Sequence, residues 1–167
     1  MISLLIRLRD KLYTSYIKTK FEEVGKNFFC QRGLSIQNGK KIFIGDNVTI
    51  NRFCNIKAVP KIVIGNDVLI SNFCILDGDI QTGNKVIFGP FCHLISDTHD
   101  YEKDISKGKG SSQITIGNNV WIASNVKILR GVNIGNNCVI GAGSVVNKNI
   151  PHNSMVAGVP ARIIRKI

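Results

Sequence analysis

The stretch that decides the fold is "ITIGNNVWIASNVKILRGVNIGNNCVIGAGSVV", residues 114–146. An aliphatic side chain recurs there at every sixth position, as Ile116, Ile122, Ile128, Ile134, Ile140 and Val146. A period of six matches neither an α-helix nor the simple alternation of an amphipathic strand. Repetition at a short fixed period is typical of a parallel β-helix, in which each unit makes one short strand and one corner. Three units would close one triangular coil of about 18 residues.

The same spacing starts earlier in the chain, at residue 44. There the sixth-position residues are Ile44, Ile50, Ile56, Ile64, Ile70, Leu76, Thr82, Phe88 and Leu94. Glycine follows several of them, and glycine with the Asn or Asp beside it tolerates the positive φ of a sharp corner. We expect the sixth-position side chains to point into the coil. A second position expected to point inward falls four residues later, at Val48, Cys54, Val68, Cys74, Val86, Cys92, Val120, Val126, Val132, Cys138 and Ser144.

The cysteines fit this pattern. Four of the five occupy small inward positions, where a free thiol packs as a weakly polar side chain. Their odd number and wide spacing match neither a disulfide framework nor a metal site, and no secretory signal precedes them. We therefore expect reduced thiols in a cytoplasmic protein. Cys92 is the one cysteine close enough to the candidate site to deserve a test.

The predicted fold is all-β, with a repeat region over residues 28–150 and two flanking segments. Residues 1–27 carry apolar side chains with basic residues between them, the pattern of an amphipathic helix. Their apolar run is too short to span a bilayer. We expect this helix to pack on the main body or on a neighbouring subunit, with a peripheral contact to the inner face of the membrane as the alternative.

The repeat is interrupted once and ends near residue 150. Residues 96–113 are rich in Asp, Lys, Gly and Ser and carry no six-residue signal, so they are predicted to form an excursion loop that leaves the coil beside His99. Pro151 and Pro160 stop the coil. Residues 151–167 then form a short basic C-terminal segment.

Charge is distributed unevenly along the chain. Residues 1–104 contain all 11 acidic residues and 14 basic ones, whereas residues 105–167 contain eight basic residues and no acid. This asymmetry indicates an anionic partner on the C-terminal side. No recognition helix, zinc spacing or aromatic RNA-binding motif is present, so a small phosphorylated ligand is favoured and a nucleic acid is not expected.

With these residues in view, the chain resembles the hexapeptide-repeat acyltransferases, in the sugar O-acetyltransferase group that includes galactoside, maltose, colanic-acid and xenobiotic acetyltransferases. The resemblance covers residues 40–167 and is most specific over residues 114–167. It implies a left-handed β-helix, although parallel crossovers are usually right-handed. It also implies a homotrimer whose active sites lie between neighbouring coils, with acetyl-CoA as the donor and a sugar or oligosaccharide as the acceptor.

Acetyl transfer to a hydroxyl needs a base and a donor for the oxyanion. His99, in "DTHDY", matches the family's catalytic histidine, and an imidazole titrates near working pH. His93 is the competing base, but it follows an inward position and is expected to contact the acceptor or to serve the structure. The resemblance assigns the oxyanion donor to the backbone N–H of Ser124.

The resemblance also identifies a donor site. Trp121 matches a tryptophan that lines the pantetheine channel, and Ala123, Ala142 and Gly143 leave room for the pantetheine arm against the backbone. The basic residues matched to the phosphates of CoA are Lys148, Arg162 and Arg165.

The acceptor site is less sharply defined. Asn72 and Asp77, in "SNFCILDGD", match the family's sugar-contacting Asn and Asp with local spacing that departs by about one residue. Asp97 and Asp100 flank His99, and either could orient the imidazole or bind the acceptor. His152 is expected at the surface, after the coil has ended.

The leading hypothesis is an acetyl-CoA-dependent O-acetyltransferase acting on a sugar of a surface polysaccharide. N-acetylation of a nucleotide-linked amino sugar is the second enzyme hypothesis, and a non-catalytic β-helix scaffold is the third. A γ-class carbonic anhydrase shares the coil, but zinc needs three imidazoles at one point, and the three histidines are not placed to converge.

Overall fold

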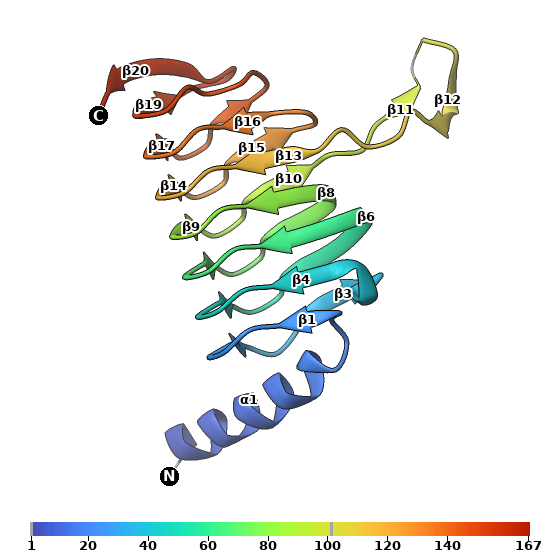
Figure 1. Cartoon of the computed structure of the whole chain (residues 1–167), viewed down its shortest axis with the longest axis vertical. Coiled ribbons are helices and arrows are strands. Elements are labelled where there is room, and N and C mark those ends of the chain that lie inside the picture. The colour runs from blue at the N-terminus through green and yellow to red at the C-terminus, as the bar shows by residue number, and fades with distance from the viewer. Residues whose placement is uncertain (1, 101) are drawn as a thin grey trace.

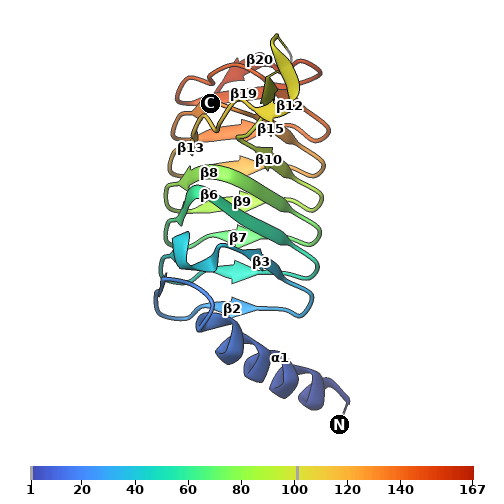
Figure 2. The same cartoon turned by 90° about the vertical axis from the view of Figure 1, so that its right-hand side faces the viewer.

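A computed structural model describes residues 2–100 and 102–167 of the chain. The polypeptide winds into a stack of triangular coils, with α1 (Ile2–Lys18) beneath the first coil and the C-terminal strand at the other end (Figures 1 and 2). No helix in the described part of the chain is long and apolar enough to cross a membrane. The predicted all-β parallel coil is confirmed.

Each coil contributes one strand to each of three faces of the prism. The first face contains β1 (Glu23–Val24), β4 (Ile42–Ile44), β13 (Ile114–Ile116) and β16 (Asn133–Ile134). The second contains β2 (Phe29–Cys30), β5 (Thr49–Ile50), β7 (Leu69–Ile70), β9 (Val86–Phe88), β14 (Val120–Ile122), β17 (Cys138–Ile140) and β19 (Ser154–Ala157). The third contains β3 (Ser35–Gln37), β10 (His93–Ile95), β15 (Lys127–Leu129) and β18 (Val145–Val146).

Two long strands join the third face to the first. β6 (Asn55–Ile64) and β8 (Ile75–Thr82) bend around the edge between these faces and pair in parallel, with a register shift between Ala58 and Ile62. A short 3-10 helix, η1 (Gly39–Lys41), precedes β4 at the same edge. As a result, the first and third faces form one 10-stranded sheet, while the second face forms an 8-stranded sheet.

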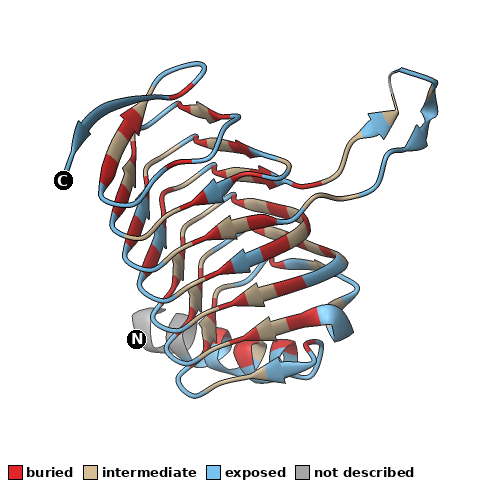
Figure 3. Cartoon of the chain, turned by 45° about the horizontal axis from the view of Figure 1, so that its top comes forward, coloured by how far each residue is buried: buried red, intermediate tan, exposed pale blue. Residues whose placement is uncertain are grey.

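Parallel, in-register stacking produces the core. Ile122 pairs with Phe88 in the coil before it and with Ile140 in the coil after it, and all three side chains are fully buried. Because each coil places the same sequence position in the same column, β-branched and aromatic side chains pack on their equivalents one coil away. Buried positions therefore line the inside of every face (Figure 3). All five cysteines are free and buried, including the four predicted at inward positions.

The corner between the first and second faces is built on asparagine. Asn27, Asn47, Asn119, Asn137 and Asn153 all have positive φ there, a conformation that Asn adopts more readily than other side chains. Their amides also bond from coil to coil, as from Asn47 Nδ2 to the Oδ1 of the following Asp67 at 2.8 Å. Hydrogen bonds between side chains thus connect successive coils at this corner, where the β-strands end.

The corner between the second and third faces carries phenylalanine instead. Phe53, Phe73 and Phe91 have φ of 58°, 60° and 63°, an unusual region for a bulky side chain. Their rings stack, with centroids 5.3 and 5.0 Å apart. We call these three residues the Phe column. All three rings are exposed, so the column forms an apolar strip that ends one coil before Asn125.

Thr82 is the polar member of an otherwise aliphatic column. Its Oγ1 accepts a hydrogen bond from the Gly65 backbone N–H at 3.1 Å, where other coils use a backbone carbonyl. Replacing Thr82 by valine should lower the free energy of unfolding by about 1–3 kcal/mol, because that partly buried N–H loses its acceptor. Urea denaturation at one fixed protein concentration measures the effect. Thr82→Ser, which keeps the hydroxyl, is the control, and a valine variant as stable as the parent would contradict the assignment.

Two boundaries differ from the sequence predictions, and the excursion contains strands that the sequence did not predict. The helix ends at Lys18, and β1 already belongs to the first coil, because Glu23 and Val24 pair with β4. At the other end, β19 adds another strand to the second face, and β20 (Arg162–Lys166) folds back antiparallel on it. The excursion at 96–113 contains a two-stranded hairpin, β11 (His99–Asp100) and β12 (Asp104–Gly108).

Candidate active site

An apolar groove of about 730 Å³ runs along the outside of the second face, near its C-terminal end. Side chains pointing outward from β14, β17 and β19 form its floor, and Ile164 of β20 borders it. The indole of Trp121 is 53% exposed in this groove. Its lining residues are Gly89, Trp121, Ala123, Ser124, Val139, Gly141, Ala142, Met155, Val156, Ala157 and Ile164.

The groove brings together four residues of the predicted donor site: Trp121, Ala123, Ser124 and Ala142. Gly143 follows Ala142 directly, with φ of 70°. Ile122 fills the buried column between Trp121 and Ala123, so the indole faces outward and is not part of the core. Small residues at the edge of the face keep the groove open beside the backbone.

The backbone N–H of Ser124 is free at the rim of this groove. Its neighbours are satisfied, since the Ala123 N–H donates to Ile140 O at 2.9 Å and the Asn125 N–H donates to Pro90 O at 2.8 Å. Among the described residues, none accepts a bond from the Ser124 N–H. Gly89 permits this close approach, because a Cβ there would lie 2.6 Å from Ser124 N. A free N–H in an apolar groove is suited to bind a developing oxyanion.

The basic residues of the C-terminal segment lie on or near β20. Arg165 pairs with Met155 of the groove floor and Arg162 pairs with Ala157, and both side chains are exposed. Their strand therefore carries two guanidinium groups along the groove's border. Lys148 is also exposed, but it lies after β18 and outside the groove lining of a single copy.

His99 lies on the hairpin, whose base is fixed to the coil. The Ser112 N–H donates to Ser96 O at 2.9 Å across the neck, and Arg130 Nη2 donates to Ser112 Oγ at 2.7 Å. Gly78 lets buried Ser96 approach the coil, since a Cβ at Gly78 would collide with the Ser96 side chain. The direction in which the hairpin leaves the coil is therefore set by specific contacts.

The hairpin does not reach the groove of its own chain. It leaves at the edge between the third and first faces and points away from the coil, whereas the groove lies on the second face (Figures 1 and 3). The His99 side chain is exposed on β11. One copy of the chain therefore presents His99 and the Ser124 N–H on different sides of the prism.

The predicted acceptor residues lie along the middle coils. Asn72 is next to Phe73 of the Phe column, and its Oδ1 accepts the Arg52 N–H at 3.1 Å. Asp77 forms an ion pair with Lys57 at 3.2 Å. Asp97 accepts the N–H of the adjacent Thr98 at 2.8 Å, at the start of the hairpin. These contacts give Asn72, Asp77 and Asp97 a structural part in the coil and the hairpin.

His93 lies half-buried on β10, in register with Lys127 of the next coil. Burial, followed by the positive charge of Lys127, lowers the pKa of His93 below its ordinary value. Its imidazole is therefore neutral at neutral pH and able to accept a hydrogen bond.

The sequence reasoning missed two features of this region. The Phe column was visible as "NRF", "SNF" and "GPF" at equivalent positions of successive coils, but bulky residues are not expected at positive φ. The second missed feature is the structural role of His152. Its Nδ1 accepts the Asn136 N–H at 2.8 Å, the position that an Asn side chain holds in earlier coils.

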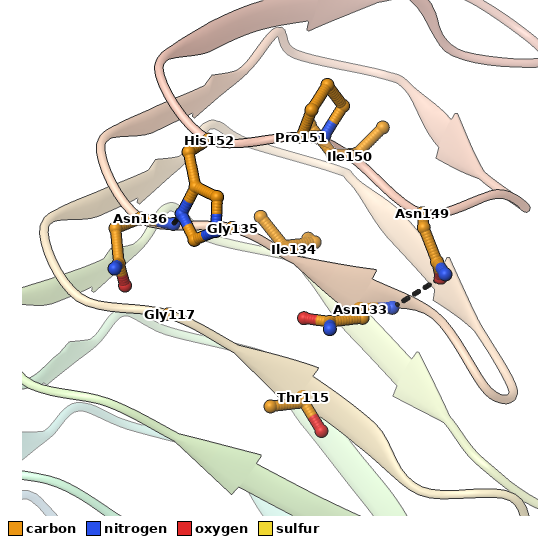
Figure 4. Close-up of a pocket in the computed structure, with 10 residues that line it drawn as sticks. All are labelled: Thr115, Gly117, Asn133, Ile134, Gly135, Asn136, Asn149, Ile150, Pro151 and His152. Carbon is orange, nitrogen blue, oxygen red and sulfur yellow. Dashed lines mark hydrogen bonds between the residues drawn. The ribbon is translucent and has the colours of Figure 1, made fainter.

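His152 also borders a second groove, of about 430 Å³, on the first face (Figure 4). Asn149 Oδ1 accepts the Asn133 N–H there at 2.8 Å, and Thr115 lies on the strand below. The amide of Asn149 and the imidazole of His152 thus form hydrogen bonds between successive coils. No group of three or more His, Cys, Asp or Glu side chains that could hold a metal ion is found within residues 2–100 and 102–167.

Comparison with known proteins identifies the family of this chain. The family model "Bacterial transferase hexapeptide (six repeats)" matches residues 113–148. The galactoside O-acetyltransferase of Escherichia coli K12 is 40% identical over 155 residues, which cover 92% of this chain and 68% of that protein. The chain belongs to the hexapeptide-repeat acetyltransferases. It spans about two thirds of the length of this family member.

Two solved structures of the family extend the comparison. A galactoside acetyltransferase in complex with coenzyme A superposes with a TM-score of 0.68 at 37% identity, covering 92% of this chain and 68% of that one. A variant of AntD, an N-acyltransferase from Bacillus cereus in complex with dTDP and coenzyme A, gives a TM-score of 0.82 at 25% identity, covering 91% and 88%. The fold and the acyltransferase class predicted from the sequence are confirmed.

Proposed function

We propose that this acetyltransferase moves an acetyl group from acetyl-CoA to a hydroxyl of a sugar, in a site shared between two copies of the chain. The observation that carries the proposal is the free Ser124 N–H at the rim of an apolar groove that contains Trp121 and Ala142. Coenzyme A is present in the galactoside acetyltransferase structure, which supports the same donor here.

The donor fits the groove in two parts. The pantetheine arm lies along the floor beside Trp121 and the small residues, with its thioester carbonyl at the Ser124 N–H. The phosphates extend toward Arg162 and Arg165 on β20, whose guanidinium groups bind phosphate by paired hydrogen bonds. Apolar contacts hold the arm while a few polar groups fix its direction.

The transfer is direct. His99 removes the proton from the acceptor hydroxyl as its oxygen attacks the thioester carbonyl, and the resulting oxyanion accepts the Ser124 N–H. Collapse of the tetrahedral intermediate breaks the carbon–sulfur bond. The departing CoA thiolate then takes the proton from His99, so the enzyme returns to its starting state.

A homotrimer supplies both halves of the site. Because the hairpin points away from its own groove, His99 can meet the Ser124 N–H of a neighbouring copy only. Closed cyclic association repeats the same contact at each interface, so three equivalent sites result.

Mixing two defective proteins tests this arrangement. His99→Ala removes the base and Ala142→Trp fills the groove, so each homotrimer is expected to be inactive. After unfolding and joint refolding, random mixed trimers should recover up to about a quarter of the parental activity, because one interface in four joins an intact His99 to an intact groove. A site within one chain would recover none, since every chain carries one defect.

Replacement of Arg165 tests where the phosphates of acetyl-CoA bind. Arg165→Ala should raise the KM for acetyl-CoA by about tenfold and leave the KM for the acceptor within about twofold, since one charge-assisted bidentate contact is lost. Steady-state kinetics with each substrate varied in turn separates the two constants. Equal changes in both would contradict the assignment. Lys41→Ala, which removes an exposed cation at the edge between the third and first faces of an early coil, is the control.

The acceptor is proposed to lie beyond the thioester, against Asn72 and the Phe column. Aromatic edges and an amide suit a sugar, which has both apolar C–H faces and hydroxyls. We infer a unit of a surface polysaccharide as the natural acceptor. Acetyl-CoA turnover over galactosides, other oligosaccharides and amino sugars, followed by CoA release, tests the proposal. If no acceptor with a hydroxyl group were acetylated, the proposal would be overturned.

The AntD structure favours one alternative. That N-acyltransferase contains dTDP with coenzyme A and superposes over 91% of this chain. N-acetylation of a nucleotide-linked amino sugar would use the same groove and the same base. Direct competition between a hydroxyl acceptor and a dTDP-linked amino sugar distinguishes the two, because the preferred acceptor has the larger kcat/KM.

A further inference from the structure

The helix α1 is fixed to the base of the coil by one face. Ile17 is buried there, the Tyr13 hydroxyl donates to Leu34 O at 3.3 Å, and the Thr14 hydroxyl donates to Cys30 O at 2.9 Å. These contacts come from the first coil. They leave no freedom for the helix to turn its other face inward, so the residues opposite them face solvent.

That outer face carries an apolar stripe. Leu8, Leu12 and Tyr16 follow one another at intervals of four, which places them in one row along the helix. Their side chains are 56%, 66% and 57% exposed. Scattered exposed leucines need no explanation, but a row on one helix face marks an interaction surface.

Positive charge flanks the stripe. Arg9 and Lys11 are exposed on α1 near its middle, and Lys18 is exposed in its last turn. Asp10 is the one acidic residue in the sequence of α1, and its side chain is buried against the coil beside Arg9. Lys20 Nζ lies 4.6 Å from the centre of the Tyr16 ring. The outward face therefore combines apolar side chains with cations.

We propose that the outer face of α1 docks on an anionic lipid bilayer, with Leu8, Leu12 and Tyr16 entering the interface and the flanking cations meeting lipid headgroups. An apolar row bordered by Lys and Arg is the pattern of helices that lie in a membrane surface. A second copy of the same face would bring like charges together, which disfavours self-association through it. The bilayer complements both the apolar stripe and the charge.

This surface is separate from the groove and goes beyond the proposed reaction. α1 lies at the end of the coil opposite β20 and the groove (Figure 1). In the proposed homotrimer, cyclic symmetry places all three helices at the same height along the axis, so one assembly would present three docking surfaces to one bilayer.

Vesicle co-sedimentation of the full chain tests the docking. We expect binding to vesicles of phosphatidylcholine with about a third phosphatidylglycerol, weaker binding to pure phosphatidylcholine, and a decrease as ionic strength rises. The double variant Leu8→Ser, Leu12→Ser should lose affinity by at least about tenfold, because two leucine side chains no longer enter the interface. Lys11→Glu, Lys18→Glu should lose binding to the anionic vesicles selectively.

The control is Ile105→Ser, which removes an apolar side chain that is even more exposed, on the hairpin, and should bind vesicles like the parent. Circular dichroism and sedimentation velocity of each variant check that fold and assembly are unchanged. A parental chain that ignores anionic vesicles, or a serine double variant that binds them as tightly as the parent, would overturn the proposal. A serine double variant with a changed oligomeric state would instead assign this face to contact between copies. CoA release with a soluble acceptor tests the proposed function separately.

Discussion

His99→Ala is expected to lower kcat by about 10²–10⁴-fold, while the coil and the groove stay intact. The imidazole is the proposed base for the acceptor hydroxyl, and its side chain is exposed on the hairpin, so its removal creates no cavity in the core. Turnover of acetyl-CoA with a saturating sugar acceptor measures the loss. The KM for acetyl-CoA should change little, because His99 does not line the donor groove.

Two variants serve as comparisons for this result. Lys107→Ala alters the same hairpin at an exposed ion pair with Asp104, and should keep nearly full activity. His93→Ala removes the competing imidazole and should affect KM for the acceptor more than kcat. If His99→Ala kept full turnover, or if His93→Ala produced the larger loss in kcat, the base would have to be reassigned.

Ala142→Trp is expected to abolish donor binding, with a rise in the KM for acetyl-CoA of at least about 100-fold, since a large ring would occupy the space proposed for the pantetheine arm. Ala142 is exposed within the groove, so the indole can be accommodated without disturbing the buried columns. Titration calorimetry with coenzyme A gives the affinity directly.

The matched control for the groove is Ala142→Ser, which adds one oxygen and should keep affinity within a few-fold. An unchanged denaturation midpoint for Ala142→Trp would show that the coil is intact. Undiminished coenzyme A binding by Ala142→Trp would place the donor outside this groove and remove the main support for the proposed site.

The repeat and the core could be predicted because both depend on local, regular constraints. A residue such as Ile122 repeats its position in every coil, so one period identifies the face, the corner and the buried column together. Trp121 was placed outside the core in the same way, because Ile122 takes the adjacent inward position, whereas Ala142 was singled out as a small residue within the family resemblance. The family resemblance then supplied their chemical roles.

Other features depended on contacts that no period encodes. The hairpin around His99 is directed by Ser96, Ser112 and Arg130, which are distant in sequence, so neither its strands nor its direction could be predicted. The strand β19 continues the second face although Pro151 was expected to end it, because the intervening turn restores the register. The free Ser124 N–H is apparent only once the bonds of its neighbours are known.

The ends of the prism have a consequence for solubility. A parallel coil exposes unpaired amides and carbonyls at its first and last turns, and such edges can recruit further chains into growing fibres. Here α1 covers the first turn, and β20 reverses direction against β19, which interrupts the register that an incoming chain would need. The molecule thereby limits its own stacking to a finite length, and removal of either terminus would expose a template for polymer growth.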